Sequence, residues 1–232
     1  MANITQLKHL EHLEDEMLNY GVRGCHAAVD FLRELRKMVG RKPTGSMMQT
    51  KWDGAPSVVC GKHPYTGRFF VGTKSVFNIT EPKLCYFDDD VDTYYQGDLA
   101  NKLKASLEHF KKLDIGGVIQ GDLLYTDDVN QENINGQNLY TFRPNTITYA
   151  IPVDHPLGEQ CKSSKIGVVF HTHYTGDDLG SMQAHGGVPD SMIGSHSDVL
   201  NIKNTTAVQD VNFSAAEFNE FDRHVDEIER MC

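Results

Sequence analysis

Hydrophobic residues at helical spacing dominate the first forty positions of the chain. The pattern runs through residues 4–20, breaks at Gly21 and resumes over residues 25–39. Spacings of three and four place these apolar side chains on one face of an amphipathic helix. Gly40 then follows as a natural helix end. The pattern predicts an N-terminal helical hairpin over residues 1–40, with a packing role.

The last twenty residues predict a further helix. Ser214 and Glu217 have the spacing of a capping box, in which each side chain bonds the other residue's backbone N–H. Phe213 and Phe218 flank this box as a hydrophobic staple. An apolar stripe at helical spacing follows, formed by Phe218, Phe221, Val225 and Ile228.

Short apolar runs separated by turn residues fill the middle of the chain. They predict strands at residues 47–51, 57–60, 69–73, 118–125, 138–142, 146–151 and 165–174. A helix is expected over residues 99–110, and the acidic run 88–92 is expected to be a solvated loop. Residues 176–211 are rich in Gly, Ser and Asp, so we expect mostly loop there. The predicted class is α+β, with the hairpin of residues 1–40 preceding a second domain over residues 41–232.

Composition and charge limit the kinds of partner that the chain can bind. At 232 residues the chain can hold a large domain with a helical appendage, and its net charge is −10. Because proteins that wrap duplex nucleic acid normally carry a basic excess, any contact with nucleic acid must be local. No apolar run approaches the length of a membrane span, so we expect no membrane partner.

The cysteines indicate a reducing compartment. There are five, at positions 25, 60, 85, 161 and 232, with no CxxC pair. An odd, scattered set is typical of free thiols in a cytosol. We therefore expect all five to be reduced.

The run Lys51-Trp52-Asp53-Gly54 carries the sharpest chemical signal. A lysine that attacks the α-phosphate of a nucleotide must lose its proton, which requires a pocket that lowers its pKa. A strand end followed by a glycine turn holds the amine while the backbone approaches the ligand closely. The alternative interpretation is an exposed strand end followed by an Asp-Gly turn.

This run resembles the first motif of the superfamily of DNA ligases, RNA ligases and mRNA-capping enzymes. Three further runs resemble later motifs of that superfamily, in the same order: residues 70–75, 118–125 and 166–170. The resemblance covers residues 47–174. It implies a ligase-type nucleotidyltransferase fold with twisted antiparallel sheets.

The resemblance also implies a reaction. Lys51 would attack the α-phosphate of ATP, release pyrophosphate and form a lysyl-AMP phosphoramidate, with Mg²⁺ as the metal. Asp53 would orient Lys51 or its metal. Nucleic acid ends are candidate acceptors.

Four residues would bind the nucleotide if the resemblance holds. Gln49 would read the base, since strand alternation places it on the same face as Lys51. Lys74 would lie near the nucleotide or the acceptor strand. Asp122 would bind the ribose, and Phe170 would stack on the base.

The sequence departs from the superfamily in two respects. Asp122 stands where the superfamily usually has Glu. The later motifs, a Glu-Gly strand that binds metal and a Lys-x-Lys strand that holds the α-phosphate, are absent after Tyr174. An incomplete chain, a split domain or a derived form without turnover would each account for this, and the end of the chain inside a predicted helix favours the first. The nucleotidyltransferase domain is thus expected to be incomplete and weakly active.

A pair of histidines supports a different chemistry. Strand alternation places His171 and His173 on one face, where two imidazoles can chelate a transition metal. With Asp177 or Asp178 nearby, a metal-dependent hydrolase is the third hypothesis. Two hydrogen-bonded structural histidines are the plainer interpretation.

The chain as a whole also resembles an uncharacterised family encoded by T4-like tailed phages, especially those of marine cyanobacteria. That resemblance implies a location in the cytoplasm of an infected bacterial host and leaves association with the virion open. A non-enzymatic interaction or virion module that retains the fold is the second hypothesis.

Overall fold

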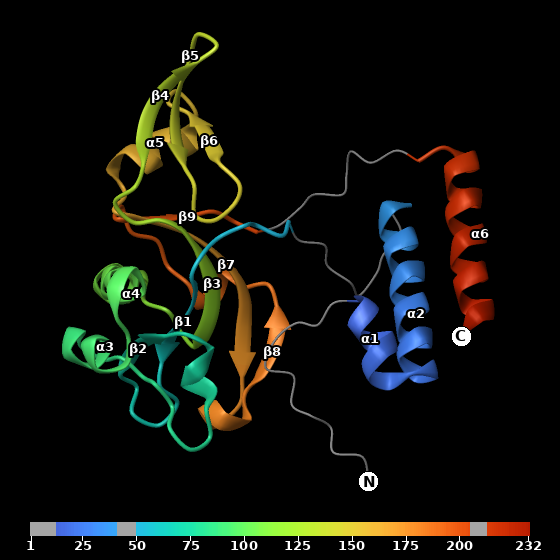
Figure 1. Cartoon of the computed structure of the whole chain (residues 1–232), viewed down its shortest axis with the longest axis horizontal. Coiled ribbons are helices and arrows are strands. Elements are labelled where there is room, and N and C mark those ends of the chain that lie inside the picture. The colour runs from blue at the N-terminus through green and yellow to red at the C-terminus, as the bar shows by residue number, and fades with distance from the viewer. Residues whose placement is uncertain (1–12, 41–49, 205–212) are drawn as a thin grey trace. The chain divides into compact units, whose positions relative to one another are not determined.

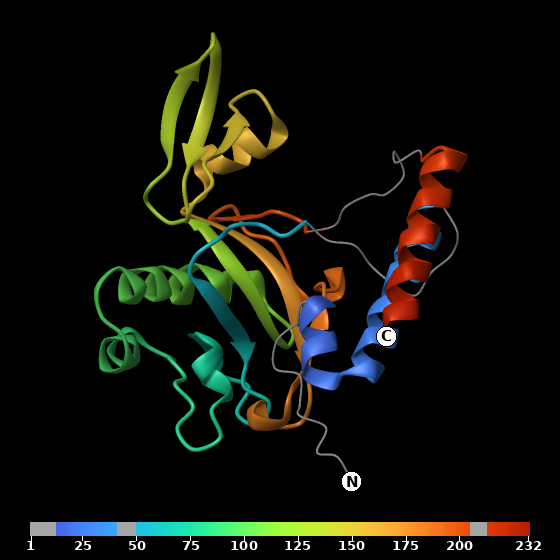
Figure 2. The same cartoon turned by 45° about the vertical axis from the view of Figure 1, so that its right-hand side comes forward.

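The computed structural model describes residues 13–40, 50–204 and 213–232, which divide into two compact units. The sheet unit comprises residues 51–204. The helical unit combines the N-terminal helices with the C-terminal helix (Figures 1 and 2). The expected second domain, residues 41–232, is therefore too long at its C-terminal end, because the last helix groups with the first two.

A six-stranded sheet forms the centre of the sheet unit, in the order β2-β1-β3-β7-β8, with β9 pairing in parallel to β7. Its strands are β1 (Ser57–Lys62), β2 (Phe69–Gly72), β3 (Val118–Tyr125), β7 (Ile166–Thr175), β8 (Gln183–Gly186) and β9 (Val199–Asn201). Every other pairing in it is antiparallel. The expected α+β class is confirmed. Of the strand predicted at residues 47–51, positions 47–49 lie outside the described residues, and Thr50 and Lys51 are not in a strand.

A second, three-stranded antiparallel sheet projects from one end of the first (Figure 1). It consists of β4 (Asn130–Ile134), β5 (Gln137–Phe142) and β6 (Tyr149–Pro152), followed by α5 (Pro156–Ser163). The hairpin of β5 and β6 was predicted, whereas β4 was not. Asn135 and Gly136 both have positive φ, as a two-residue turn between β4 and β5 requires.

Alternation along the strands gives the large sheet two distinct faces. On the α4 face, Val58, Ile119 and Phe170 pack against α4 (Gly97–Phe110) in one buried cluster. On the opposite face, called the far face here, Val59 and other residues form a second cluster. That cluster includes residues of the 3₁₀ turns η1 (Lys74–Phe77) and η3 (Leu179–Ser181). Both views show α4 lying along this sheet (Figures 1 and 2).

The acidic run expected to be a loop instead begins a helix, α3 (Asp88–Tyr94). Carboxylates are favourable in the first turn of a helix because its N-terminus carries a partial positive charge. Asp90 also accepts hydrogen bonds from the backbone N–H groups of Tyr86 and Phe87. The acidic residues 88–90 thus form the first turn of α3.

The region after residue 176 is more ordered than its composition suggests. It contains β8 and β9 as well as η3 and a further 3₁₀ turn, η4 (Asp190–Met192). The remaining 3₁₀ turn, η2 (Lys111–Leu113), continues directly from α4. The expectation of mostly loop over residues 176–211 is therefore wrong for the part up to residue 204, and residues 205–211 lie outside the description.

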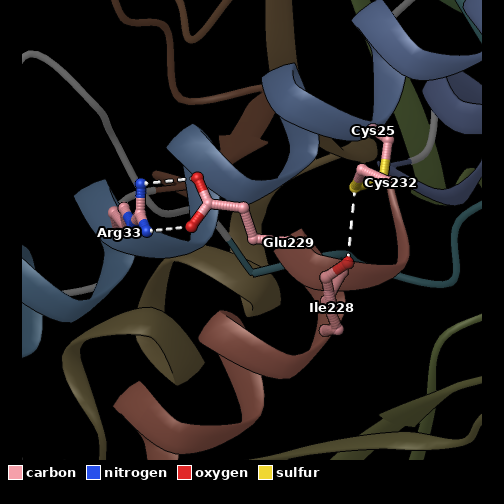
Figure 3. Close-up of a disulfide and its surroundings, with 5 residues drawn as sticks. All are labelled: Cys25, Arg33, Ile228, Glu229 and Cys232. Atoms are coloured by element: carbon pink, nitrogen blue, oxygen red, sulfur yellow. Dashed lines mark hydrogen bonds and ion pairs between the residues drawn. A yellow bond between two sulfur atoms is a disulfide. The ribbon is translucent and has the colours of Figure 1, made fainter.

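The helical unit comprises α1 (Leu13–Tyr20), α2 (Val22–Val39) and α6 (Ala215–Met231). Ser214 and Glu217 form the predicted capping box of α6, and the rings of Phe213 and Phe218 lie 5.6 Å apart. Arg33 donates two hydrogen bonds to Glu229 at 3.1 and 2.6 Å (Figure 3). These contacts join α2 to α6 over a long sequence separation.

A disulfide between Cys25 and Cys232 also joins α2 to the end of α6 (Figure 3). The expectation that all five cysteines are reduced is thus wrong for these two. Cys60, Cys85 and Cys161 are free and buried. Sequence spacing could not reveal the pair, because 207 positions separate its members.

None of the helices over residues 13–40, 50–204 and 213–232 has the length and apolar character needed to cross a bilayer.

Reduction of the disulfide is expected to loosen the helical unit selectively. A disulfide closing a long loop stabilises a fold by about 2–4 kcal/mol, mainly by restricting the unfolded chain. Treatment with a dithiol should therefore speed amide hydrogen exchange in α6 and leave β3 and β7 unchanged. The variant Cys25→Ser should exchange like the reduced protein and not respond further to dithiol. Equal exchange in α6 before and after reduction would contradict this prediction.

Candidate functional site

The segment Lys51–Gly54 runs directly onto β3 at Asp122. Ala55 donates its backbone N–H to the carbonyl of Leu123 at 2.9 Å, which prolongs the pairing of β1 with β3. A Cβ atom added to Gly54 would lie 2.6 Å from Cβ of Asp122 and 2.8 Å from the carbonyl oxygen of Leu123. Contacts this short are not tolerated, so only glycine allows the backbone this close to Asp122.

Asp53 holds the loop between β5 and β6. Its carboxylate accepts hydrogen bonds from the Asn145 side chain at 2.8 Å and from the backbone N–H groups of Thr146 and Ile147 at 2.8 and 3.0 Å. Its own N–H donates to the Tyr149 hydroxyl at 2.7 Å. The bond from Ile147, followed by those from Asn145 and Thr146, lowers the pKa of Asp53.

Lys51 is exposed, and its positive charge contributes to the lowered pKa of Asp53. The two residues therefore lie within electrostatic reach of one another. The expected role of Asp53 in orienting Lys51 stays a prediction. The carboxylate of Asp53, however, already has three hydrogen bonds to the loop, so its first role is structural.

Trp52, between these two, is partly buried. Its ring centroid lies 5.1 Å from that of Tyr149, and it packs against a hydrophobic cluster that includes Val169. Val169 is the cross-strand partner of Asp122. The indole Nε1 is buried and makes no hydrogen bond to any residue in the described ranges.

A β-bulge on β7 lies beside Asp122, at His171. In the pairing of β3 with β7, Gln120 faces Thr172 and Gly121 faces Phe170, so His171 is an extra residue without a partner. Its Nε2 lies 3.4 Å from Oδ1 of Asp122. His171 thus lies on the far face with Asp122, as alternation from Phe170 requires, and the bulge places Thr172 on the same face.

The same bulge separates the two histidines that the sequence places on one face. His173 pairs with Ile119, which belongs to the α4 face, and its ring stacks on His185 with centroids 5.0 Å apart. His173 also hydrogen bonds the carbonyl of Gly187 through Nδ1 at 2.7 Å. Among the described residues, no group of three or more His, Cys, Asp or Glu side chains is arranged to hold a metal ion. The geometry does not support a hydrolase built on His171 and His173.

Phe170 is only 5% exposed and packs edge-on against Phe110 of α4, with ring centroids 5.2 Å apart. It therefore lies on the α4 face, opposite Asp122. The structure does not bring Phe170 and Asp122 together, and the expected stacking role of Phe170 does not fit its place in the core.

The two remaining predicted site residues are not joined to this group. Gln49 lies outside the described residues. Lys74 is exposed at the start of η1, and within residues 50–204 no hydrogen bond or ion pair connects it to Asp122, His171 or the segment Lys51–Gly54. The structure thus places Gly54, from the segment that also carries Lys51 and Asp53, against Asp122 in the middle of β3. It adds His171, which the sequence assigned to other chemistry.

Comparison with known proteins places the chain in a family. A family model described as a family of unknown function, DUF6267, matches residues 3–232. The chain belongs to this family. No curated protein and no solved structure matches it. The DUF6267 match spans both units, so the helical unit is part of the family's sequence and not an addition to it.

Substitution of Gly54 by alanine is expected to destabilise the sheet unit. The added methyl group would press on Asp122 and Leu123, and overpacking of this kind costs about 1–3 kcal/mol. Trp52, the single tryptophan, lies two residues away and reports on this region by fluorescence during urea unfolding. Gly180→Ala is the matched control, because the nearest atom to its added Cβ is 3.8 Å away. Equal midpoints for the two variants would contradict the close approach.

The loop between β5 and β6 is expected to loosen in acid. Since the folded-state pKa of Asp53 is lowered, its stabilising effect is present above the ordinary Asp pKa and is lost as pH falls through the lowered value. Hydrogen-exchange protection of Thr146 and Ile147 should therefore drop in that range. The variant Asp53→Ala should lack this protection already at neutral pH. Retained protection in the variant would show that the carboxylate does not hold the loop.

Proposed function

We propose that the sheet unit binds a nucleotide and forms a covalent lysyl-nucleotide at Lys51. The observation that supports this best is the packing of Gly54 against Asp122, since it joins the lysine-bearing segment to the carboxylate expected to bind ribose. The resemblance in sequence requires these two elements to share one site. A Lys-x-Asp-Gly run that occurred by chance would not be expected to pack against β3 at Asp122.

The reaction has a simple balance. The neutral amine of Lys51 attacks the α-phosphorus of ATP, a P–N bond forms, the bond to the β-phosphate oxygen breaks and pyrophosphate leaves. As the P–N bond forms, the amine nitrogen loses one proton to solvent and keeps the other. A second step, transfer of AMP to an acceptor such as a nucleic acid end, would regenerate the lysine.

Among the described residues, no group of three or more His, Cys, Asp or Glu side chains is arranged to hold a metal ion. Mg²⁺ therefore enters the proposal only as the ion that accompanies ATP phosphates, which usually binds proteins through one or two carboxylates and keeps several waters. No step above depends on a protein-bound metal.

Two buried ring nitrogens give independent support for a ligand in this region. Nε1 of Trp52 and Nε2 of His171 are both buried without a hydrogen bond among the described residues. Buried polar atoms in folded proteins nearly always have partners, so unsatisfied ones call for an explanation. Both belong to residues around the junction of Gly54 with Asp122.

The variant Lys51→Arg is expected to abolish adduct formation without loss of stability. Arginine keeps the charge and most of the stem, but it is not deprotonated in proteins and cannot attack phosphorus. Wild type and variant are incubated with α-labelled ATP and Mg²⁺, and acid-labile label on the protein is measured. Lys62→Arg serves as the control and should label like wild type, because its partner Asp114 accepts either cation.

Equal labelling of wild type and Lys51→Arg would show that Lys51 is not the nucleophile. Binding of ATP by wild type without any label would favour the non-enzymatic module instead. Absence of both binding and label would overturn the nucleotide proposal as a whole.

A further inference from the structure

The contact between His171 and Asp122 is incomplete in a specific way. Nε2 of His171 lies 3.4 Å from Oδ1 of Asp122, within ion-pair range, yet it makes no hydrogen bond. The side chains remain 22% and 23% exposed. Among the described residues, no other group hydrogen bonds the Asp122 carboxylate. One of its oxygens thus faces an imidazole, and the other is available to a donor.

Thr172 fixes the opposite side of the imidazole ring. Its Oγ1 lies 2.8 Å from Nδ1 of His171. A carboxylate only accepts hydrogen bonds, so the proton of a neutral ring belongs on Nε2, facing Asp122. Nδ1 then accepts from the Thr172 hydroxyl. Thr172 is itself 3% exposed and held in the sheet opposite Gln120, so the ring has a rigid anchor.

The bulge makes this chain of groups possible. Alternation from Phe170 directs His171 to the far face, and the extra residue on β7 keeps Thr172 on that face as well, whereas regular alternation would turn Thr172 to the α4 face. Gln120, next to the bulge, is anchored from both sides, because it donates to Ser57 at 2.8 Å and accepts from the Tyr174 hydroxyl. The position of the imidazole is therefore built into the sheet and does not depend on a loose side chain.

We infer that His171 is a positioning residue, which holds the Asp122 carboxylate so that its other oxygen accepts a hydrogen bond from the ribose hydroxyls of the bound nucleotide. The inference rests on the proposed function. Polar contacts of this kind are often long in a free protein and shorten when the ligand binds. A ribose hydroxyl that donates to the free oxygen would reorient the Asp122 carboxylate. Its other oxygen could then accept a hydrogen bond from Nε2 of His171.

The test compares ATP with 2′,3′-dideoxy-ATP, which lacks the hydroxyls. Binding is measured by calorimetry in a Lys51→Arg background, so that no adduct forms during the titration. We expect His171→Ala to weaken ATP binding about tenfold, the loss of roughly one charge-assisted hydrogen bond. Binding of the dideoxy nucleotide should change less than about twofold, because that ligand has no hydroxyl to lose.

Two further variants distinguish a positioning role of His171 from a general loss of structure. His171→Gln keeps an N–H donor near the place of Nε2 and should restore most of the preference for ATP over the dideoxy nucleotide. His173→Ala makes the same truncation two residues away, on the other face of the strand, and should leave the preference unchanged.

Each outcome decides the matter. If His171→Ala weakens both nucleotides equally, or neither, the positioning role is wrong while the proposed function stands. If the Lys51→Arg protein binds neither nucleotide and wild type takes no label, the proposed function fails and the inference fails with it. A loss confined to ATP, rescued by His171→Gln and absent from His173→Ala, supports it.

Discussion

The pairing of β3 with β7 determines which side chains share a surface with Asp122. These two strands lie at the centre of the large sheet, and each presents alternate residues to its two faces. A single extra residue reverses the alternation for all that follow it. Because His171 is that residue, Thr172 lies on the far face with His171 and Asp122, while His173 turns to the α4 face. The chemistry available at the far face therefore follows from one irregularity in hydrogen-bond register.

The predicted elements succeeded where periodicity is strong and local. The α6 capping box, the strand over residues 118–125 and the hairpin of β5 with β6 all depend on near neighbours in sequence, and all formed. Strand β4 was missed because it is polar and exposed along its whole length, which leaves no alternation to detect. The run beginning at Asp88 was misread because charge indicates both solvated loops and helix starts.

The site was harder to predict than the fold because its geometry depends on pairing between distant strands. Alternation placed Asp122 in its strand, but it wrongly placed Lys51 in another strand and could not reveal a bulge on β7. Gly121, opposite the bulge, is the one local hint, since glycine in a strand often marks such a place. The pairing of Cys25 with Cys232 was equally hidden from local patterns. Long-range pairing, covalent or hydrogen-bonded, is the information that a single sequence does not express.

The hydrogen bonds of Asp53 also have a mechanical consequence. The residue after Trp52 is bonded to the loop that joins β5 and β6, while Gly54 is pressed against β3. The lysine-bearing segment is therefore attached at one point to the small sheet and at the next to the large one. Any ligand or partner that tilts the projecting hairpin of β4 and β5 would pull on Asp53 through this loop. A change in the angle of the small sheet would thus be transmitted to the segment that carries Lys51.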